Sequence, residues 1–222
     1  MPLVVRTWNL FHGNASPPVR RAYLREMVEL VTADRPDVVC LQELPVWALR
    51  ELDAWSSMQA VSAVARPPRL RSAELGRRIT EWNHGLFRSA FTGEADAILV
   101  DRRFRVSDER RIAVARAPLQ RIAQSVLLDG ELAVVNFHIS GVEAQWEIVA
   151  NVALAYDRVV AAGDANLPGA AIPGFSPALA GSIDQILVRG APSTSPVRWP
   201  DERRRLDGRL LSDHAPVELT VG

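Results

Sequence analysis

The sequence predicts an α/β protein in which two packed, mainly antiparallel β-sheets lie between outer helices. One observation is the order of elements: strand, helix, strand, then a series of closely spaced β-like runs, then a helix and three strands. One helix-flanked parallel sheet holds fewer strands than this, whereas two sheets packed face to face accommodate them. The other observation is that the 222 residues contain no linker, low-complexity tract or short repeat. We therefore expect a single domain over residues 1–222.

The first half of the chain alternates between strands and helices. A β-branched, apolar run predicts a strand over residues 3–10. Apolar residues at i, i+3, i+4 and i+7 predict an amphipathic helix over residues 19–31. A continuous apolar run at residues 38–41 predicts a strand that is covered on both faces. Residues 47–55 are again expected to be helical.

The second half is richer in strands. Residues 66–69 contain two adjacent prolines and are expected to be irregular, whereas residues 73–82 are expected to form a short helix. Asp129-Gly130 is a strong signal for a two-residue hairpin between two of the runs. A further helix is expected over residues 142–156. The apolar β-like runs predict strands at residues 97–100, 112–115, 122–128, 132–138, 158–163, 183–188 and 216–221.

The composition excludes some mechanisms and disfavours some partners. All 26 basic residues are arginine, so no reaction step can use a lysine. The formal net charge is zero, whereas a non-specific nucleic-acid binder is more usually basic. Arginine clusters at residues 66–78, 102–111 and 203–209 are interpreted as solvated faces. Cys40 is the only cysteine, which excludes an internal disulfide and a cysteine-built metal site.

We expect a cytoplasmic protein that does not insert into a membrane. The N-terminal segment lacks the basic stretch and long apolar core of a signal peptide. No apolar stretch approaches the roughly 20 residues that are needed to span a bilayer.

Polar residues follow the ends of several predicted strands. Asn9 ends the first strand, and Glu43 follows a buried one, where an ionised carboxylate is costly unless it is paired or metal-bound. A hard cation such as Mg²⁺ prefers oxygen ligands and usually takes one or two protein carboxylates. Glu43 with Asn9 nearby meets that need. The alternative for each residue alone is structural: an Asn that caps a turn and a Glu that faces solvent.

Asp164 and Asn166 follow the predicted strand at residues 158–163, with Gly163 at the turn. Their alternating positions place both side chains on one side of an extended backbone. The carboxylate can orient or deprotonate a water, and the carboxamide can donate to a phosphate oxygen. Gly-Asp-x-Asn is also a common turn composition, so this segment alone is a weak indicator.

Two histidines are placed to act on a phosphate. Asp184 is a charge amid β-apolar residues and needs a partner. His214 is the natural candidate, because a carboxylate that holds one ring nitrogen fixes the tautomer and raises the pKa of a histidine. His138 ends a predicted strand and can reach a non-bridging phosphate oxygen, although a strand-end histidine is more often structural. His12 and His84 have no comparable context and are interpreted as incidental.

Short segments in a fixed order carry this chemistry: Thr7-Trp8-Asn9, Leu41-Gln42-Glu43, Asn136-Phe137-His138, Gly163-Asp164-Ala165-Asn166, Ile183-Asp184-Gln185-Ile186 and Ser212-Asp213-His214-Ala215-Pro216. Each is weak alone, but the ordered set is specific. It resembles the endonuclease/exonuclease/phosphatase superfamily, the fold group of DNase I and exonuclease III, from residue 3 to about residue 219. Asp96 stands where that family usually has Asn, and Ala165 stands where it usually has an aromatic residue.

The resemblance implies a four-layer α/β sandwich and the Mg²⁺- or Mn²⁺-dependent hydrolysis of phosphate esters. It implies that Glu43 and Asn9 hold the metal, with Asp213 at the metal edge. It also implies that Asp164 positions or deprotonates the attacking water, and which residue takes the proton stays open. It implies that Asn166 and His138 bind the phosphate, and that the pair of Asp184 and His214 acts as an acid/base or as a transition-state stabiliser.

Three functions stay open. The first is a metal-dependent phosphodiesterase, with nucleases included. The second is a hydrolase of a small phosphorylated molecule, nucleotide or lipid headgroup, which fits the neutral charge. The third is a non-catalytic binding domain on the same fold, which the complete set of polar residues disfavours. The expected partner is a phosphate ester, with nucleic acid as one class, and residues 56–93 beside the cleft match no subgroup.

Overall fold

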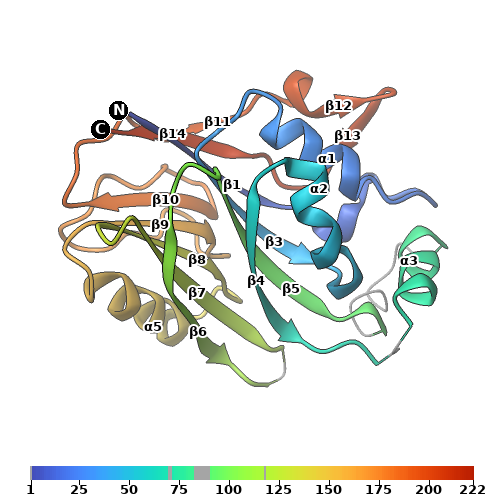
Figure 1. The fold of residues 1–222 in the computed structure, drawn as a ribbon, viewed down its shortest axis with the longest axis horizontal. Helices are drawn as coiled ribbons and strands as arrows, with labels where there is room; N and C mark the ends of the chain where they lie inside the picture. The colour runs from blue at the N-terminus through green and yellow to red at the C-terminus, as the bar shows by residue number, and fades with distance from the viewer. Residues whose placement is uncertain (1, 70–71, 83–90, 118) are drawn as a thin grey trace.

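A computed structural model of the chain describes residues 2–69, 72–82, 91–117 and 119–222 (Figure 1). The strands are β1 (Leu3–Asn9), β2 (Ala15–Ser16), β3 (Val38–Leu44), β4 (Gln59–Arg66), β5 (Glu94–Val100), β6 (Val106–Ala115), β7 (Arg121–Leu128), β8 (Leu132–His138), β9 (Val159–Asp164), β10 (Asp184–Arg189), β11 (Val197–Arg198), β12 (Arg205–Leu206), β13 (Arg209–Leu211) and β14 (Val217–Val221). The α-helices are α1 (Leu24–Thr32), α2 (Leu52–Ser56), α3 (Ala73–Trp82) and α5 (Glu143–Leu154). Short 3-10 helices are η1 (Phe11–Gly13), η2 (Val46–Glu51) and η3 (Asp201–Arg204).

Most strands belong to two large sheets that pack face to face. The first sheet has the order β11-β14-β1-β3-β5-β4, and the second has the order β10-β9-β8-β7-β6. In each sheet one neighbouring pair is parallel, β1 with β3 and β8 with β9. Helices α1 and α2 cover the outer face of the first sheet, and α5 covers the outer face of the second (Figure 1). The predicted four-layer α/β sandwich is confirmed.

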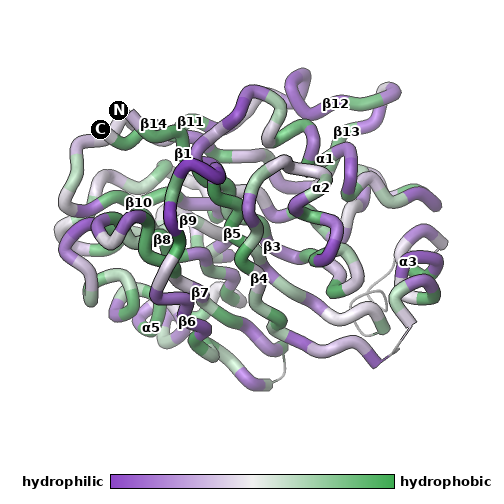
Figure 2. Tube along the Cα trace, viewed as in Figure 1, coloured by the Kyte–Doolittle hydropathy of each residue, from purple (hydrophilic) through white to green (hydrophobic). Residues whose placement is uncertain are grey.

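Apolar side chains fill the three spaces between these layers. On β5, Leu99 faces the helices while its neighbour Ile98 faces the second sheet. On β8, Val134 faces the first sheet while Phe137 packs against α5. Figure 2 shows the hydrophobic residues concentrated along the central strands of both sheets. Because both faces of these strands are buried, their sequences are continuous apolar runs rather than alternating ones.

The strand directions bring the polar segments to one edge of the sandwich. Since β1 and β3 are parallel, Asn9 lies beside Gln42 in register. Since β8 and β9 are also parallel, His138 lies beside Asp164. β10 runs antiparallel to β9 and begins there, so Asp184 pairs with Asp164. Residues far apart in the sequence therefore meet at the ends of neighbouring strands.

The helix predicted over residues 19–31 begins later, at Leu24. The N–H of Tyr23 donates to the carbonyl of Gly13 at 2.8 Å, which ties the preceding backbone to η1 instead of to a helical turn. Helical spacing identifies which residues share a face, but it does not show where such a competing backbone contact ends the helix.

Strand β4 and the small third sheet, of order β12-β13-β2, were not predicted. β4 consists largely of Ala, Ser and single valines, which give a weak strand pattern, yet it pairs with β5 along its whole length. The predicted helix at residues 73–82 is confirmed, and so is a hairpin at Asp129-Gly130, although its loop has three residues instead of two because Leu128 pairs with Leu132. Both hairpin residues have positive φ, at 51° and 76°, as the expected tight turn requires. Among the described residues, no helix is long and apolar enough to cross a membrane.

Candidate active site

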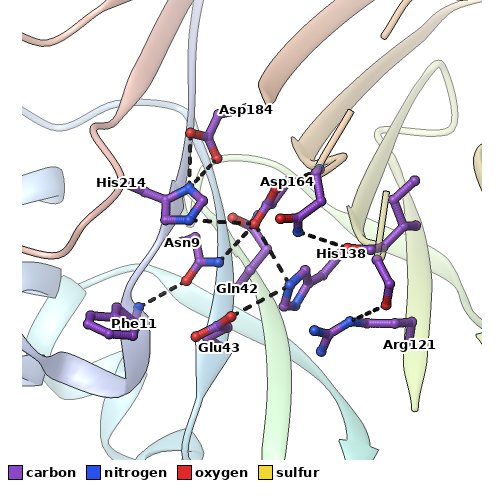
Figure 3. A network of polar contacts seen from close by, with 12 residues as sticks. Asn9, Phe11, Gln42, Glu43, Arg121, His138, Asp164, Asp184 and His214 are labelled. Carbon is purple, nitrogen blue, oxygen red and sulfur yellow. Dashed lines mark hydrogen bonds and ion pairs between the residues drawn. The ribbon is translucent and has the colours of Figure 1, made fainter. Parts of the chain in front are cut away.

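Polar side chains from both large sheets point toward one another at this edge (Figure 3). Asn9, His138, Asp164 and Asp184 are each 3% exposed or less. Polar groups so deeply buried need hydrogen-bonding or ionic partners, so their contacts define the site.

His214 and Asp184 form the tightest contact of the site. Nδ1 of His214 lies 2.9 and 3.1 Å from the two carboxylate oxygens of Asp184, as the sequence predicts for this pair. Burial lowers the pKa of His214, but the hydrogen bond and charge of Asp184, aided by the charge of Asp164, outweigh it and raise the pKa to about 9. The ring is therefore protonated at neutral pH, with Nε2 3.8 Å from Oδ2 of Asp164.

Asp164 lies at the centre of the group. Nδ2 of Asn9 donates to its Oδ2 at 2.9 Å, and the N–H of Asn166 donates to its Oδ1 at 2.8 Å. Burial and the charge of Asp184 raise the pKa of Asp164 to about 6, against these hydrogen bonds and the charge of His214. This carboxylate therefore becomes ionised just below neutral pH.

Glu43 enters the site from an irregularity in β3. The pairing of β3 with β5 breaks between Leu41 and Leu44, and Glu43 has a φ of 56°. Such a bulge re-aims a side chain that would otherwise follow the regular alternation of the strand. The carboxylate oxygens of Glu43 lie 3.6 Å from Nε2 of His138 and 3.7 Å from Nε2 of His12. Burial raises the pKa of Glu43.

His12, interpreted from the sequence as incidental, lies beside Glu43 in the structure. The backbone of His12 has a left-handed φ of 52° within η1, shortly after β1. This bend brings the His12 ring to Glu43. A sequence pattern does not show such a bend, although the position of His12 three residues after Asn9 was an available signal. His84, interpreted in the same way, lies outside the described residues.

His138 is held between carboxylates. Its Nδ1 lies 3.5 Å from Oε1 of Glu94, and its Nε2 lies 3.8 Å from Oδ2 of Asp164. Burial and the positive charge of Arg121 lower the pKa of His138 well below its usual value, so the ring is neutral. Nε2 is buried and has no hydrogen-bond partner among the residues that the structure describes, with the Glu43 and Asp164 carboxylates 3.6 and 3.8 Å away.

Arg121 and Glu94 are site residues that the sequence did not reveal. Arg121 begins β7 in the second sheet, and its guanidinium pairs with Oε1 of Glu94, which begins β5 in the first sheet. Arg121 is 8% exposed and Glu94 is 6% exposed. Each begins or precedes a predicted strand, but no spacing pattern links two residues that meet only when the sheets pack.

The amide side chains of the site have structural contacts as well. Oδ1 of Asn9 accepts a hydrogen bond from the N–H of Phe11 at 2.9 Å, and Nδ2 of Asn166 donates to the carbonyl of Ile139 at 2.9 Å. Asp213 lies at the margin, with a side chain that is 45% exposed and 4.0 Å from Nε2 of His214.

Some residues of the short segments bind the two sheets together instead of facing the site. Nδ2 of Asn136 donates to the carbonyls of Leu41 and Ala97 at 3.1 and 3.0 Å. Nε2 of Gln42 donates to Oδ1 of Asn136 at 2.8 Å and to the hydroxyl of Thr7 at 3.0 Å. The bonds of Asn136 cross between the two sheets, whereas the bond between Gln42 and Thr7 joins two strands of the first sheet.

The sequence suggested a turn at Gly163, but this residue lies inside β9. A Cβ atom at this position would lie 2.0 Å from the carbonyl oxygen of Phe137 on the neighbouring strand. Only glycine permits this close approach of β8 and β9, which sets His138 beside Asp164.

The environment of Glu43 suits a divalent cation. Among the described residues, the basic side chains within 4.0 Å of its carboxylate are His12 and the neutral His138, and no arginine lies that close. A bound cation would therefore offset the cost of a buried, ionised carboxylate. The nearby oxygen donors are of the type that Mg²⁺ and Mn²⁺ accept.

A second potential ligand group lies beside the first. Its ligand atoms lie within 4.8 Å of one another, and its members are Asp164, Asp184 and His214. Here Nδ1 of His214 is already bonded to both oxygens of Asp184, so a metal would have to compete with that contact.

Comparisons with known proteins agree with this geometry. Residues 7–214 match the profile of the Endonuclease/Exonuclease/phosphatase family. A search of curated proteins gave no match. Similar solved structures include a functionally unknown conserved protein from Enterococcus faecalis V583 (16% identity, 99% of each chain covered, TM-score 0.73). A second is an endonuclease/exonuclease/phosphatase from Bacteroides vulgatus (16% identity, 100% of this chain and 99% of that chain covered, TM-score 0.72). A third is truncated Caenorhabditis elegans TDP2 (18% identity, 100% of this chain and 97% of that chain covered, TM-score 0.67). At these identities the structures show a shared fold. Because the profile match covers most of the chain, this protein belongs to the endonuclease/exonuclease/phosphatase family, whose members generally hydrolyse phosphoester bonds.

Proposed function

We propose that the protein is a divalent-metal-dependent phosphodiesterase that uses Asp164, His214 and His138 on its substrate. The observation that carries this proposal is the position of Asp164. One buried carboxylate, with a pKa of about 6, lies 3.8 Å from Nε2 of each of two histidines and is oriented by Asn9. Three groups with different proton affinities thus converge on one point, as acid/base catalysis on a water and a phosphate requires.

Asp164 is the group that orients the attacking water and accepts its proton. At neutral pH it is ionised, and Asn9 and the backbone of Asn166 fix both of its oxygens. Positioning of the nucleophile is a large part of catalysis in phosphoryl transfer, because the transition state needs an in-line arrangement.

His214 and His138 stabilise charge on the phosphate. His214 is protonated, and because Asp184 holds its Nδ1, Nε2 is the donor that faces substrate. It serves either to protonate the leaving oxygen or to neutralise a phosphoryl oxygen. His138 is neutral and buried, so its unpartnered Nε2 donates to a non-bridging oxygen when that nitrogen carries the ring proton. Asn166 adds a carboxamide at the margin.

Glu43 and Asn9, with Asp213 at the edge, are the residues that would hold Mg²⁺ or Mn²⁺. The cation would supply positive charge against the phosphoryl oxygens. The chain's own contribution would be oxygen donors of unequal exposure, since the Glu43 side chain is 20% exposed and that of Asp213 is 45% exposed.

The alternative is a hydrolase of a small phosphorylated molecule. Several of the arginines that could follow a nucleic-acid backbone are paired with acidic neighbours. Examples are Arg102 with Asp53, Arg110 with Asp108, and Arg203 with Asp34. Together with the zero formal net charge, this pairing weakens the attraction for a long polyanion and favours a compact substrate.

The deciding experiment compares supercoiled plasmid, single-stranded RNA and a small phosphomonoester, each with and without Mg²⁺. Glu43→Gln removes the proposed ligand charge, and Glu147→Gln on the exposed face of α5 is the matched control. We expect metal-dependent hydrolysis that falls at least about 100-fold in Glu43→Gln and is unchanged in Glu147→Gln. Cleavage of the monoester alone would establish the phosphatase, and full activity of Glu43→Gln would refute the assigned site. Calorimetry with Mg²⁺ identifies a non-catalytic domain if no metal binds.

A further inference from the structure

Arg204 is a buried arginine directly behind the segment that carries His214. It is 6% exposed and ends η3. Its Nη1 donates to the carbonyls of Leu211, Ser212 and His214 at 2.8, 2.9 and 3.0 Å. The interpretation of residues 203–209 as a solvated arginine face is therefore wrong for this residue.

The carbonyls that Arg204 binds belong to a tightly bent segment. Ser212 has a φ of 59°, and its hydroxyl donates to the carbonyl of Asn9 at 2.7 Å and accepts from the N–H of His214 at 3.1 Å. The bend turns several carbonyls inward, where each needs a donor. Nε1 of Trp8 is a neutral donor, 2.9 Å from the His214 carbonyl, and Arg204 is a charged donor.

The guanidinium is itself fixed in orientation. Its Nη2 donates to Oδ1 of Asp201, three residues earlier in η3, at 2.8 Å. A planar, charged fork anchored at one end presents its other nitrogen in a defined direction, which an ammonium on a flexible stem does less well. The contacts fix the backbone on both sides of Asp213, and with it the origin of the His214 side chain.

We propose that Arg204 is a positioning residue for His214: it holds the backbone of residues 211–214 so that the imidazole meets Asp184 and directs Nε2 toward Asp164. Arg204 acts through the backbone and makes no contact with substrate. The consequence of Arg204 for catalysis rests on the proposed function, whereas the effect of Arg204 on the geometry of His214 is independent of that function. The two are therefore tested separately.

The geometric test uses the Nδ1 proton of His214, which should give a downfield resonance because it is bonded to Asp184. The chain has only four histidines, and His214→Asn assigns the signal by its loss. In Arg204→Met we expect this resonance to broaden or disappear, while the amide spectrum of the remaining chain persists. Arg204→Lys should retain it in part, and Arg205→Met, whose exposed arginine is the next residue, should retain it fully.

The kinetic test uses bis(p-nitrophenyl) phosphate with Mg²⁺. A displacement of the acid/base group should lower kcat in Arg204→Met by about 10- to 100-fold with little change in KM, and Arg204→Lys should restore part of it. In a His214→Ala background, Arg204→Met should cause no further loss, because both changes remove the same function.

Three results would overturn the proposal. They are an unchanged His214 resonance in folded Arg204→Met, an equal loss of kcat with and without His214, and collapse of the fold in both the Met and the Lys variants. If no variant, nor the parent protein, hydrolyses the diester, the proposed function fails, and the resonance still decides the role of Arg204.

Discussion

Asp164 and His214 both have raised pKa values, but for different reasons. Burial and a neighbouring carboxylate raise the pKa of Asp164 to about 6, whereas hydrogen bonding to Asp184 raises that of His214 to about 9. Between these two values Asp164 is ionised and His214 is protonated. This is the combination that a base and an acid, or a base and a charged donor, require.

The rate of hydrolysis should therefore depend on pH in a bell shape. It should rise as pH passes about 6, where Asp164 loses its proton, and fall as pH passes about 9, where His214 loses its own. Asp184→Asn removes the largest cause that raises the pKa of His214, so the alkaline limb should move to lower pH. The measurement is kcat/KM against pH for both proteins. An alkaline limb that stays in place would show that it belongs to another group.

The sequence could reveal these residues only in part. Asp164, Asp184 and His214 stand in short segments whose order is informative, and strand ends predict where they meet. His12 and Arg121 could not be found this way, because each reaches the site through a three-dimensional contact. His12 depends on a left-handed bend after β1, and Arg121 depends on how the second sheet packs against the first.

At the scale of elements, the contact of β8 with β9 depends on the missing side chain of Gly163. In Gly163→Ala the new Cβ would lie 2.0 Å from the backbone carbonyl oxygen of Phe137. A backbone atom cannot rotate away as a side chain can, so the two strands must separate. We expect a loss of stability of about 2 kcal/mol or more and a lower kcat, because His138 and Asp164 are paired across this junction. Urea unfolding and kinetics measure both. Ala161→Gly in the same strand is the control for a simple change of strand propensity.

The pair of Arg121 and Glu94 joins the two sheets beside the site. Both side chains are nearly inaccessible, so removing Arg121 leaves the buried carboxylate of Glu94 with only one arginine partner, Arg66, at the longer distance of 3.4 Å. We expect Arg121→Met to reduce the free energy of unfolding by about 3–5 kcal/mol. In the double variant Arg121→Met, Glu94→Gln, much of the loss should return. Equal stability of the single and double variants would mean that the cost is lost packing and not the loss of a charge partner.

The elements that sequence reasoning predicted best are those with strong local signals. The Asp129-Gly130 turn needs two residues with positive φ, and its composition provides them. β4 was missed because its Ala and Ser residues have little intrinsic preference for a strand, and its existence depends on β5 beside it. The early start predicted for α1 was wrong because Tyr23 bonds to Gly13, a contact that periodicity does not encode.

At the scale of the whole molecule, the two sheets share a continuous core. Residues such as Ile98 and Val134 from opposite sheets belong to one buried cluster, and the bonds of Asn136 cross between the same sheets. Neither sheet can keep its inner face buried without the other.

The chain should therefore unfold as one unit, in keeping with a single domain over residues 1–222. Tryptophan fluorescence and far-UV circular dichroism should give coincident urea transitions, since one probe reports packing and the other backbone structure. Two separated transitions would show that the sheets, or a helical layer, unfold independently.

Cys40 lies in the core between the two sheets, three residues before Glu43, and it is completely buried. Burial also raises the pKa of its thiol, which keeps it in the unreactive protonated form. Cys40 can therefore serve as a native probe of how often the core opens. A thiol-reactive dye added under native conditions attaches only during the moments when the sandwich opens beneath the site. The labelling rate therefore reports how often the core between the two sheets opens at Cys40, in the unmodified chain and without an engineered probe.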